Sequence, residues 1–165
     1  LEGDWEHALA QLQEVMPEIE AQNDTFWSLN HRIVVAWTLT RLERIDEARV
    51  ILRQNLQESI EFGDRSAENL AVEALATVSA FDDDAERALL LAGAAEAIAA
   101  EVGGKAPAEL VIALDPVVLA KERGAISDDE AERILRQGRA IGTEAARELA
   151  REVAERDTGS RATHS

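Results

Sequence analysis

An alanine recurs along this chain at a fixed interval of 40 residues, at Ala8, Ala48 and Ala88. Each copy follows a polar, acidic stretch and opens an apolar stripe with helical spacing. Self-similarity at a period of about 20 to 50 residues is typical of stacked helical units, which bury their apolar faces against one another. The interval therefore predicts an all-α array of antiparallel helical hairpins. Such arrays mostly serve as binding surfaces, so the repeat indicates an architecture before it indicates a ligand.

The composition agrees with closely packed helices. Of the 165 residues, 46% are hydrophobic but only 4% are aromatic, whereas strands favour β-branched and aromatic residues. The sequence contains no cysteine, which excludes a disulfide framework and a thiolate metal site. The length is that of one domain.

The net charge of −16 restricts the partners that this chain can have. Binding of nucleic acid requires a basic face that displaces counterions from phosphate, and anionic membranes attract basic segments in the same way. No apolar run is long enough to span a bilayer, and no signal peptide is visible. We therefore expect a cytoplasmic chain that binds neither nucleic acid nor membrane, and whose partner is a protein, a peptide or a small-molecule effector.

Capping residues and apolar spacing divide the first 104 residues into five expected helices. Asp46 is expected to cap the third of them, and Gly63-Asp64 to end it, because glycine is favoured just past a helix C-terminus. The first helix has no partner helix before it, which suggests a piece of a longer protein and leaves open a homodimer formed through that helix. The expected helices cover residues 4 to 17 or 21, 25–44, 46–62, 66–80 and 84–102.

The pattern changes beyond Gly104. Ser127 and Glu130 have the spacing of a capping box, which predicts the start of a helix at this point. We divide the chain into helical repeats over 1–104 with a truncated first unit, a helical C-terminal cap over 105–157, and a disordered tail over 158–165. In the cap we expect a sixth helix that starts at Pro107 and is interrupted by Asp115-Pro116, a seventh from Ser127 that is broken between Gly138 and Gly142, and an eighth over Thr143 to Arg156.

The paired-helix units resemble tetratricopeptide repeats. When the recurring alanine is set at the small position of the second helix, Val35, Ala36 and Leu39 fall at the aliphatic, small and bulky positions of the first. In the next unit Ser79 stands where a large residue is usual. The resemblance implies a right-handed superhelix, capped by the C-terminal helices, whose first helices line a concave groove.

A second resemblance covers about residues 84–150. The segment Ala88 to Ile98, the Pro107-x-Glu109 segment and the run from Gly138 to Ala146 look like the C-terminal helical region of large bacterial signal-transduction ATPases and transcriptional regulators of the LuxR and AfsR/MalT-like type. In that family the region acts as a sensor or interaction arm beside an ATPase module and a DNA-binding domain, neither of which this sequence contains. Ala92 and Ile141-Gly142 depart from the pattern.

A run of small residues, from Ala92 to Ala95, has a physical meaning of its own. Gly93 inside a helix costs about 1 kcal/mol relative to alanine. Small side chains let a neighbouring helix approach closely, which can offset that cost. We therefore expect another helix to pack tightly here.

The candidate binding residues are those that the resemblance to tetratricopeptide repeats places in the groove. Trp and Arg are enriched at interaction hot spots, so Trp37 and Arg41 lead the set. For Trp37 the alternative is packing in the core, and Trp5 and Trp27 are expected to pack at hairpin ends. The full set is Asn30, Ile33, Trp37, Thr40, Arg41, Glu73, Thr77 and Phe81.

The sequence predicts no catalytic residue, no metal site and no cofactor. His7 and His31 lack metal-binding spacing. The acidic run Asp82-Asp83-Asp84 is explained by the start of a helix, where negative charge interacts favourably with the positive end of the helix dipole. Ser66 and Ser127 are expected to be helix caps and not nucleophiles. The leading hypothesis is a non-catalytic sensor or interaction domain of a bacterial transcriptional regulator. A stand-alone adaptor that scaffolds protein partners is the alternative, and an all-α enzyme is a third.

Overall fold

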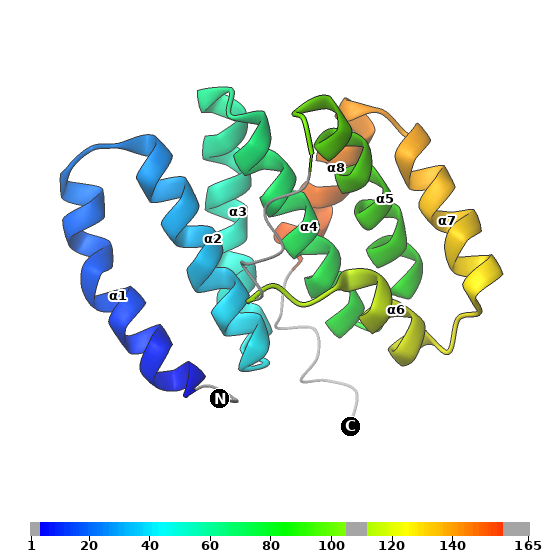
Figure 1. The fold of residues 1–165 in the computed structure, drawn as a ribbon, viewed down its shortest axis with the longest axis horizontal. Coiled ribbons are helices and arrows are strands. Elements are labelled where there is room, and N and C mark those ends of the chain that lie inside the picture. The colour runs from blue at the N-terminus through cyan, green and yellow to red at the C-terminus, as the bar shows by residue number, and fades with distance from the viewer. Residues whose placement is uncertain (1–3, 105–111, 157–165) are drawn as a thin grey trace.

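A computed structural model describes residues 4–104 and 112–156 of the chain (Figure 1). Within these ranges every regular element is a helix, so the predicted all-α class is confirmed. The helices are α1 (Trp5–Ala21), α2 (Thr25–Arg41), α3 (Ile45–Phe62), α4 (Arg65–Phe81), α5 (Ala85–Glu101), α6 (Pro116–Gly124), α7 (Asp128–Ala140) and α8 (Thr143–Ala154).

The first five helices follow one another as antiparallel neighbours, each packed against the next (Figure 1). The turns between them are built alike. Each has one residue in the left-handed region of the backbone, and these residues recur every 20 positions. The recurring alanine interval of 40 residues is therefore two steps of one helix and one turn. The left-handed residues are Asn23, Glu43, Gly63, Asp83 and, after α5, Gly103.

Aspartate caps most of these helices. The side chains of Asp24, Asp64 and Asp84 each accept a hydrogen bond from the backbone N–H three residues on. At the equivalent position before α3 stands Arg44, whose side chain makes no such bond. The prediction that Asp46 caps α3 is wrong, because the 20-residue step places the cap at 44 and leaves Asp46 inside the first turn.

Two other boundary predictions are also wrong. Ser66 lies inside α4, since Asp64 is the cap. Pro116 does not interrupt a helix but begins α6, because proline at the first helical position needs no N–H partner and Asp115 caps the remaining ones. The predicted start at Pro107 and the predicted disordered tail over 158–165 lie outside the described residues.

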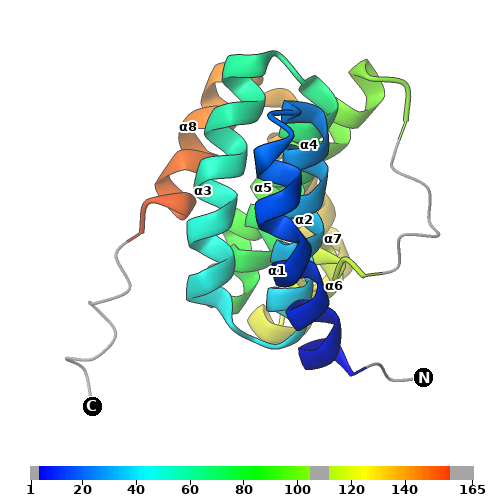
Figure 2. The ribbon, with the colours of Figure 1, turned by 90° about the vertical axis from the view of Figure 1, so that its left-hand side faces the viewer.

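The last three helices wrap around the end of the stack. Helix α6 packs on α4 and α5 from one side, α7 packs along α5, and α8 packs on α3, α4 and α5 from the other side (Figures 1 and 2). Ser127 caps α7 as predicted. Helix α7 continues through Gly138 to Ala140, so the break comes only at Ile141-Gly142.

The tight helix contact expected at the small-residue run is confirmed. A Cβ atom on Gly93 of α5 would lie 2.2 Å from the carbonyl oxygen of Leu135 in α7. Conversely, a Cβ atom on Gly138 of α7 would lie 2.2 Å from the carbonyl oxygen of Leu90 in α5. The two backbones therefore meet through a reciprocal pair of glycines, which only residues without a side chain allow.

The repeated alanines differ in how deeply they are buried. Ala48 and Ala88 are fully buried, and Ala8 is half-buried. Ala48 belongs to a small apolar cluster with Leu9, Val35 and Leu39, which joins α1, α2 and α3. The larger core runs from α2 to α8 and includes Ala88. One continuous core thus holds the later hairpins, and the smaller cluster attaches α1 to them.

Candidate functional site

All eight predicted binding residues belong to α2 and α4, and an extended segment of the same chain lies across these two helices. Residues 112–115 pass from the C-terminal end of α2 across α4 and lead into α6 (Figure 1). We call the surface of α2 and α4 that this segment covers the front face. Its geometry shows what kind of chain these two helices can hold.

Arg41, the last residue of α2, binds the beginning of the segment. Its Nε donates a hydrogen bond of 2.8 Å to the carbonyl oxygen of Ile112. One Nη atom lies 3.5 Å from the carbonyl oxygen of Ala113, a longer and weaker contact. The guanidinium also lies over the ring of Trp5 from α1, with its central carbon 5.6 Å from the ring centroid. Arg41 is therefore held between an aromatic ring and the main chain of the segment.

Thr77 of α4 binds the next part of the segment. Its hydroxyl is almost completely buried and donates to the carbonyl oxygen of Leu114 at 3.3 Å. The side chains of Ile112 and Ala113 pack against the main core. The front face thus recognises main-chain carbonyls with side-chain donors and offers an apolar surface to the segment's side chains.

The end of the segment is fixed by α6. Asp115 accepts hydrogen bonds from the N–H groups of Val117 and Val118, at 2.8 and 3.3 Å, and so caps α6. From the other end of α6, Arg123 donates to the carbonyl oxygen of Ala80 at 3.0 Å and lies 5.2 Å from the ring centroid of Phe81. This cation–π contact holds α6 against the end of α4.

The structure brings only part of the predicted set to the segment. Arg41 and Thr77 contact the segment directly. Phe81 does not, but its ring contacts Arg123 of α6. Glu73 is half-buried on α4, one turn before Thr77. Of the remaining predicted residues, Ile33, Trp37 and Thr40 are buried in α2, and Asn30 donates to the carbonyl of Phe26 within the same helix.

Sequence reasoning did not find the other half of this site. Ile112, Ala113 and Leu114 take part mainly through carbonyl groups, which every residue carries, so no side-chain pattern marks them. Trp5 was expected to pack at a hairpin end, and its contact with Arg41 is consistent with that position. Arg123 could have been proposed from the sequence as a contact residue, since it is a basic residue two helical turns after Pro116, in the last turn of α6.

Comparisons with known protein families, with curated proteins and with solved structures find no match for this chain. The site must therefore be interpreted from its own chemistry. None of the helices in the described ranges combines the length and apolar character needed to cross a membrane.

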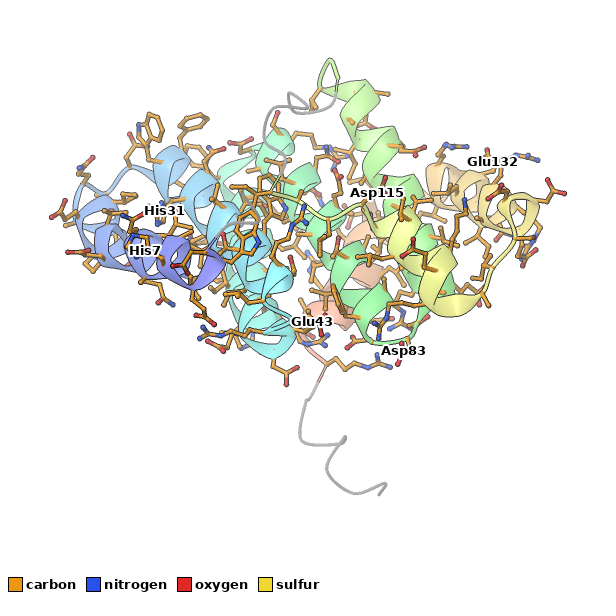
Figure 3. All side chains as sticks on the ribbon, turned by 60° about the horizontal axis from the view of Figure 1, so that its bottom comes forward. His7, His31, Glu43, Asp83, Asp115 and Glu132 are labelled. Carbon is orange, nitrogen blue, oxygen red and sulfur yellow. The ribbon has the colours of Figure 1, made fainter. Side chains whose placement is uncertain are left out.

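Metal-ligating side chains do not gather in the part of the chain that the structure describes. His7 and His31 lie on α1 and α2, far from Glu132 on α7 (Figure 3). The ring of His31 makes a 2.7 Å hydrogen bond with the carbonyl of Leu12, which joins α1 to α2. Of the acidic run at the α4–α5 turn, Asp83 pairs with Arg123 and Asp84 caps α5.

The opposite side of the stack, where α8 lies, is held by buried charges. Arg49 of α3 donates to both carboxylate oxygens of Asp82, at 2.8 and 2.9 Å, and to the carbonyl of Val153 in α8 at 2.7 Å. Near the other end of α8, Arg147 donates to both carboxylate oxygens of Glu68, at 2.7 and 3.1 Å. The Arg147–Glu68 pair fixes α8 to α4, and the bond from Arg49 to Val153 fixes α8 to α3. The extended segment over residues 112–114 lies on the other side, on the front face.

Proposed function

We propose that this chain is a non-catalytic interaction domain, arranged as a tetratricopeptide-like right-handed superhelix, that binds a protein or peptide partner on its front face. We further propose that it serves a bacterial transcriptional regulator, in which partner or effector binding controls an attached ATPase or DNA-binding module. The observation that supports a binding function is the hold of Arg41 and Thr77 on the main chain of residues 112–114.

The chemistry of this hold suits a partner that binds in extended form. A guanidinium and a hydroxyl donate to carbonyl oxygens, which any peptide presents at regular intervals along its main chain. The apolar side chain of Ile112 supplies the burial that such a contact needs. A partner with an aliphatic residue at that position would use the same donors.

Control of an attached module would follow from exchange on the front face. The segment over 112–114 and a partner segment would occupy the same donors, so partner binding would favour the state in which residues 112–114 are released. A ligand shifts such an equilibrium only by its difference in affinity for the two states. The internal segment competes with a partner at a high effective concentration, about millimolar for a short connection, because it belongs to the same chain.

A peptide with the sequence of residues 112–116, Ile-Ala-Leu-Asp-Pro, tests the front face when it carries a fluorescent label. We expect Ile112→Ser to weaken the internal segment and to increase the affinity for this peptide by about tenfold over the unchanged protein. Adding Arg41→Ala to Ile112→Ser should abolish the gain, because the main donor is lost. Fluorescence anisotropy measures the affinities, with Arg136→Ala on the exposed part of α7 as the matched arginine control. Equal affinity for all variants would contradict binding on the front face.

The complete gene product tests the regulator part of the proposal separately. We expect it to contain a phosphate-binding ATPase module, and we expect Arg41→Ala to change its rate of ATP hydrolysis or its affinity for promoter DNA severalfold. Arg136→Ala should leave both quantities unchanged. A gene product without an ATPase or DNA-binding module would exclude a regulator and favour the stand-alone adaptor.

A further inference from the structure

Three aromatic side chains are exposed where α2 begins and α3 ends. The exposed fractions are 52% for Phe26, 59% for Trp27 and 58% for Phe62. The whole chain has only three Phe, three Trp and no Tyr, so half of its aromatic residues lie largely in solvent. Folding alone gives no reason to leave such large apolar surfaces exposed. We call Phe26, Trp27 and Phe62 together the aromatic end.

These three residues belong to neighbouring helices and lie at the same level of the stack. Phe26 and Trp27 are in the first turn of α2, and Phe62 ends the antiparallel helix α3 (Figure 1). Arg32 of α2 pairs with Glu58 of α3, which brings the start of one helix beside the end of the other. The rings of Phe26 and Trp27 are packed edge to face, with centroids 5.6 Å apart. Phe26 and Trp27 therefore form one pair of rings, and Phe62 lies at the same level on the adjoining helix.

The surroundings of the aromatic end are acidic. Residues 1–31 contain seven Asp and Glu residues and no Lys or Arg. Glu18, Asp24 and Glu61 are exposed around the patch. Among the described residues, the first cation after this stretch is Arg32, which is 7% exposed and already pairs with Glu20 and Glu58. Near Phe62, Glu61 lines a hollow with Arg53 and Arg151, and Arg65 already pairs with Glu68 and Glu101. The excess of negative charge therefore lies on the side of α1 and α2, at Glu18 and Asp24 beside the rings of Phe26 and Trp27.

This combination selects the chemistry of the occupant. We propose that the aromatic end docks a cationic, amphipathic segment of another protein, whose apolar side covers the rings and whose Lys and Arg side chains pair with the surrounding acids. A second copy of this chain would bring like charges together, and an anionic membrane would be repelled for the same reason. Aromatic side chains in such a setting are typical interaction hot spots.

The aromatic end is distinct from the front face. Trp27 and Arg41 stand 14 residues apart on the same helix, which places them roughly 20 Å apart at 1.5 Å per residue. The inference therefore does not depend on the proposed function of the front face.

The probe for this surface is a 14-residue amphipathic peptide of leucine and lysine, titrated into the intact protein. We expect binding in the micromolar range, weaker at high salt, with a blue shift of tryptophan emission as Trp27 becomes covered. Trp27→Ala should weaken binding by about tenfold or more, and Phe62→Ala by a smaller factor. Both side chains are exposed, so neither variant should alter the helical circular dichroism. Calorimetry measures the affinities.

Two matched controls separate the patch from general attraction to an acidic protein. Val50→Ala removes an equally exposed side chain at the other end of α3, and Arg41→Ala alters the front face. Neither should change the affinity. A peptide with glutamate in place of lysine should not bind. Equal affinity of Trp27→Ala, Phe62→Ala and the unchanged protein would overturn the proposal, as would a concentration-dependent dimer that Trp27→Ala abolishes.

Discussion

The C-terminal part of this chain is attached to the hairpin stack in two different ways. On the front face, residues 112–114 are held through their main-chain carbonyls by Arg41 and Thr77. On the opposite side, α8 is held by the ion pair of Arg147 with the buried Glu68, and by Arg49 of α3, which pairs with Asp82 at the end of α4 and donates to the carbonyl of Val153 in α8. The first attachment depends little on the sequence of the segment. In the second, the Arg147–Glu68 pair requires a particular residue on each partner, and the buried Asp82 requires the charge of Arg49 beside it.

Because of this difference, we expect that another peptide can replace residues 112–114 on the front face, whereas α8 stays attached on the opposite side. A main-chain contact can be made by another extended peptide with little loss, because every peptide carries the same carbonyl groups. A buried ion pair tolerates no such replacement, since removal of one partner leaves a charge in a place poor in water. We therefore expect substitutions on the α8 side to act on stability and substitutions on the front face to act on binding.

The largest expected effect comes from breaking the attachment of α8 at Arg49. The side chains of Arg49 and Asp82 are 4% and 1% exposed. Arg49→Met keeps the length of the side chain but removes the two hydrogen bonds to Asp82 and the one to the carbonyl of Val153, while Arg156 stays 3.3 Å from Asp82. We expect the free energy of unfolding to fall by about 3 to 5 kcal/mol. Urea denaturation followed by circular dichroism measures the loss.

Arg41→Ala is the matched control for this comparison, since it removes an arginine that donates to carbonyls from the front face. We expect a loss of only about 1 kcal/mol. Combining Arg49→Met with Asp82→Asn should recover part of the larger loss, because the buried carboxylate charge is then absent. If Arg41→Ala cost as much as Arg49→Met, the distinction between the two attachments would be wrong.

A second prediction tests the helix that leads into α8. Gly138→Ala would place a Cβ atom 2.2 Å from the carbonyl oxygen of Leu90, so α7 would have to move away from α5. We expect a loss of about 2 to 3 kcal/mol in the free energy of unfolding, despite the better helix propensity of alanine. Ala140→Val, at an exposed position of the same helix, should change stability by less than about 0.5 kcal/mol. A stability gain in Gly138→Ala would show that the two helices can separate without cost.

Much of the stack could be predicted from its sequence because local signals set it. The turn and cap at residues 23–25, Gly63 at the end of α3 and the start of α5 after Asp84 are short-range features that the sequence indicates. The caps of α3 and α4 were assigned to Asp46 and Ser66 instead of residues 44 and 64, because neighbouring polar residues offer the same signal. The tight α5–α7 contact was also predictable from the side of α5, because a glycine inside a helix destabilises it unless another helix packs closely against the run of small residues around Gly93. Its partner Gly138 was interpreted as a helix break, because sequence alone does not show which helix lies opposite.

The candidate surfaces were less accessible to such reasoning. The front face depends on where residues 112–114 lie, and contacts made by carbonyls leave no pattern in side chains. The aromatic end depends on the start of α2, with Trp27, lying at the same level as the end of α3, with Phe62, and on both rings being left uncovered. Trp27 was expected to pack at a hairpin end, yet 59% of it is exposed. Periodicity predicts which face of a helix is apolar but not which apolar residues the neighbours fail to cover.

The smallest predicted effect concerns acid, which should weaken the attachment of α8 but not the carbonyl contacts of the front face. Burial by itself raises the pKa of the Glu68 carboxyl, but the hydrogen bonds from Arg147 and Arg65 lower it by more, so the pKa lies below its ordinary value of 4.5. The unfolded chain then binds more protons than the folded one, so the stability contributed by Glu68 is complete above about pH 4.5 and is lost as the pH falls through the lowered pKa. Carbonyl contacts on the front face do not titrate in this range.

Glu68→Gln isolates this contribution from those of the other acids. We expect the variant to be less stable than the unchanged protein at neutral pH, and the difference to shrink as the pH falls from about 6 to about 3. One proton limits the slope of this difference to about 1.4 kcal/mol per pH unit. Urea midpoints at each pH measure it, with Glu144→Gln, the exposed partner of Arg147, as the control. A difference that stays constant with pH would mean that the Glu68 carboxyl has the same pKa in the folded and unfolded chains, and that the attachment of α8 does not depend on its charge.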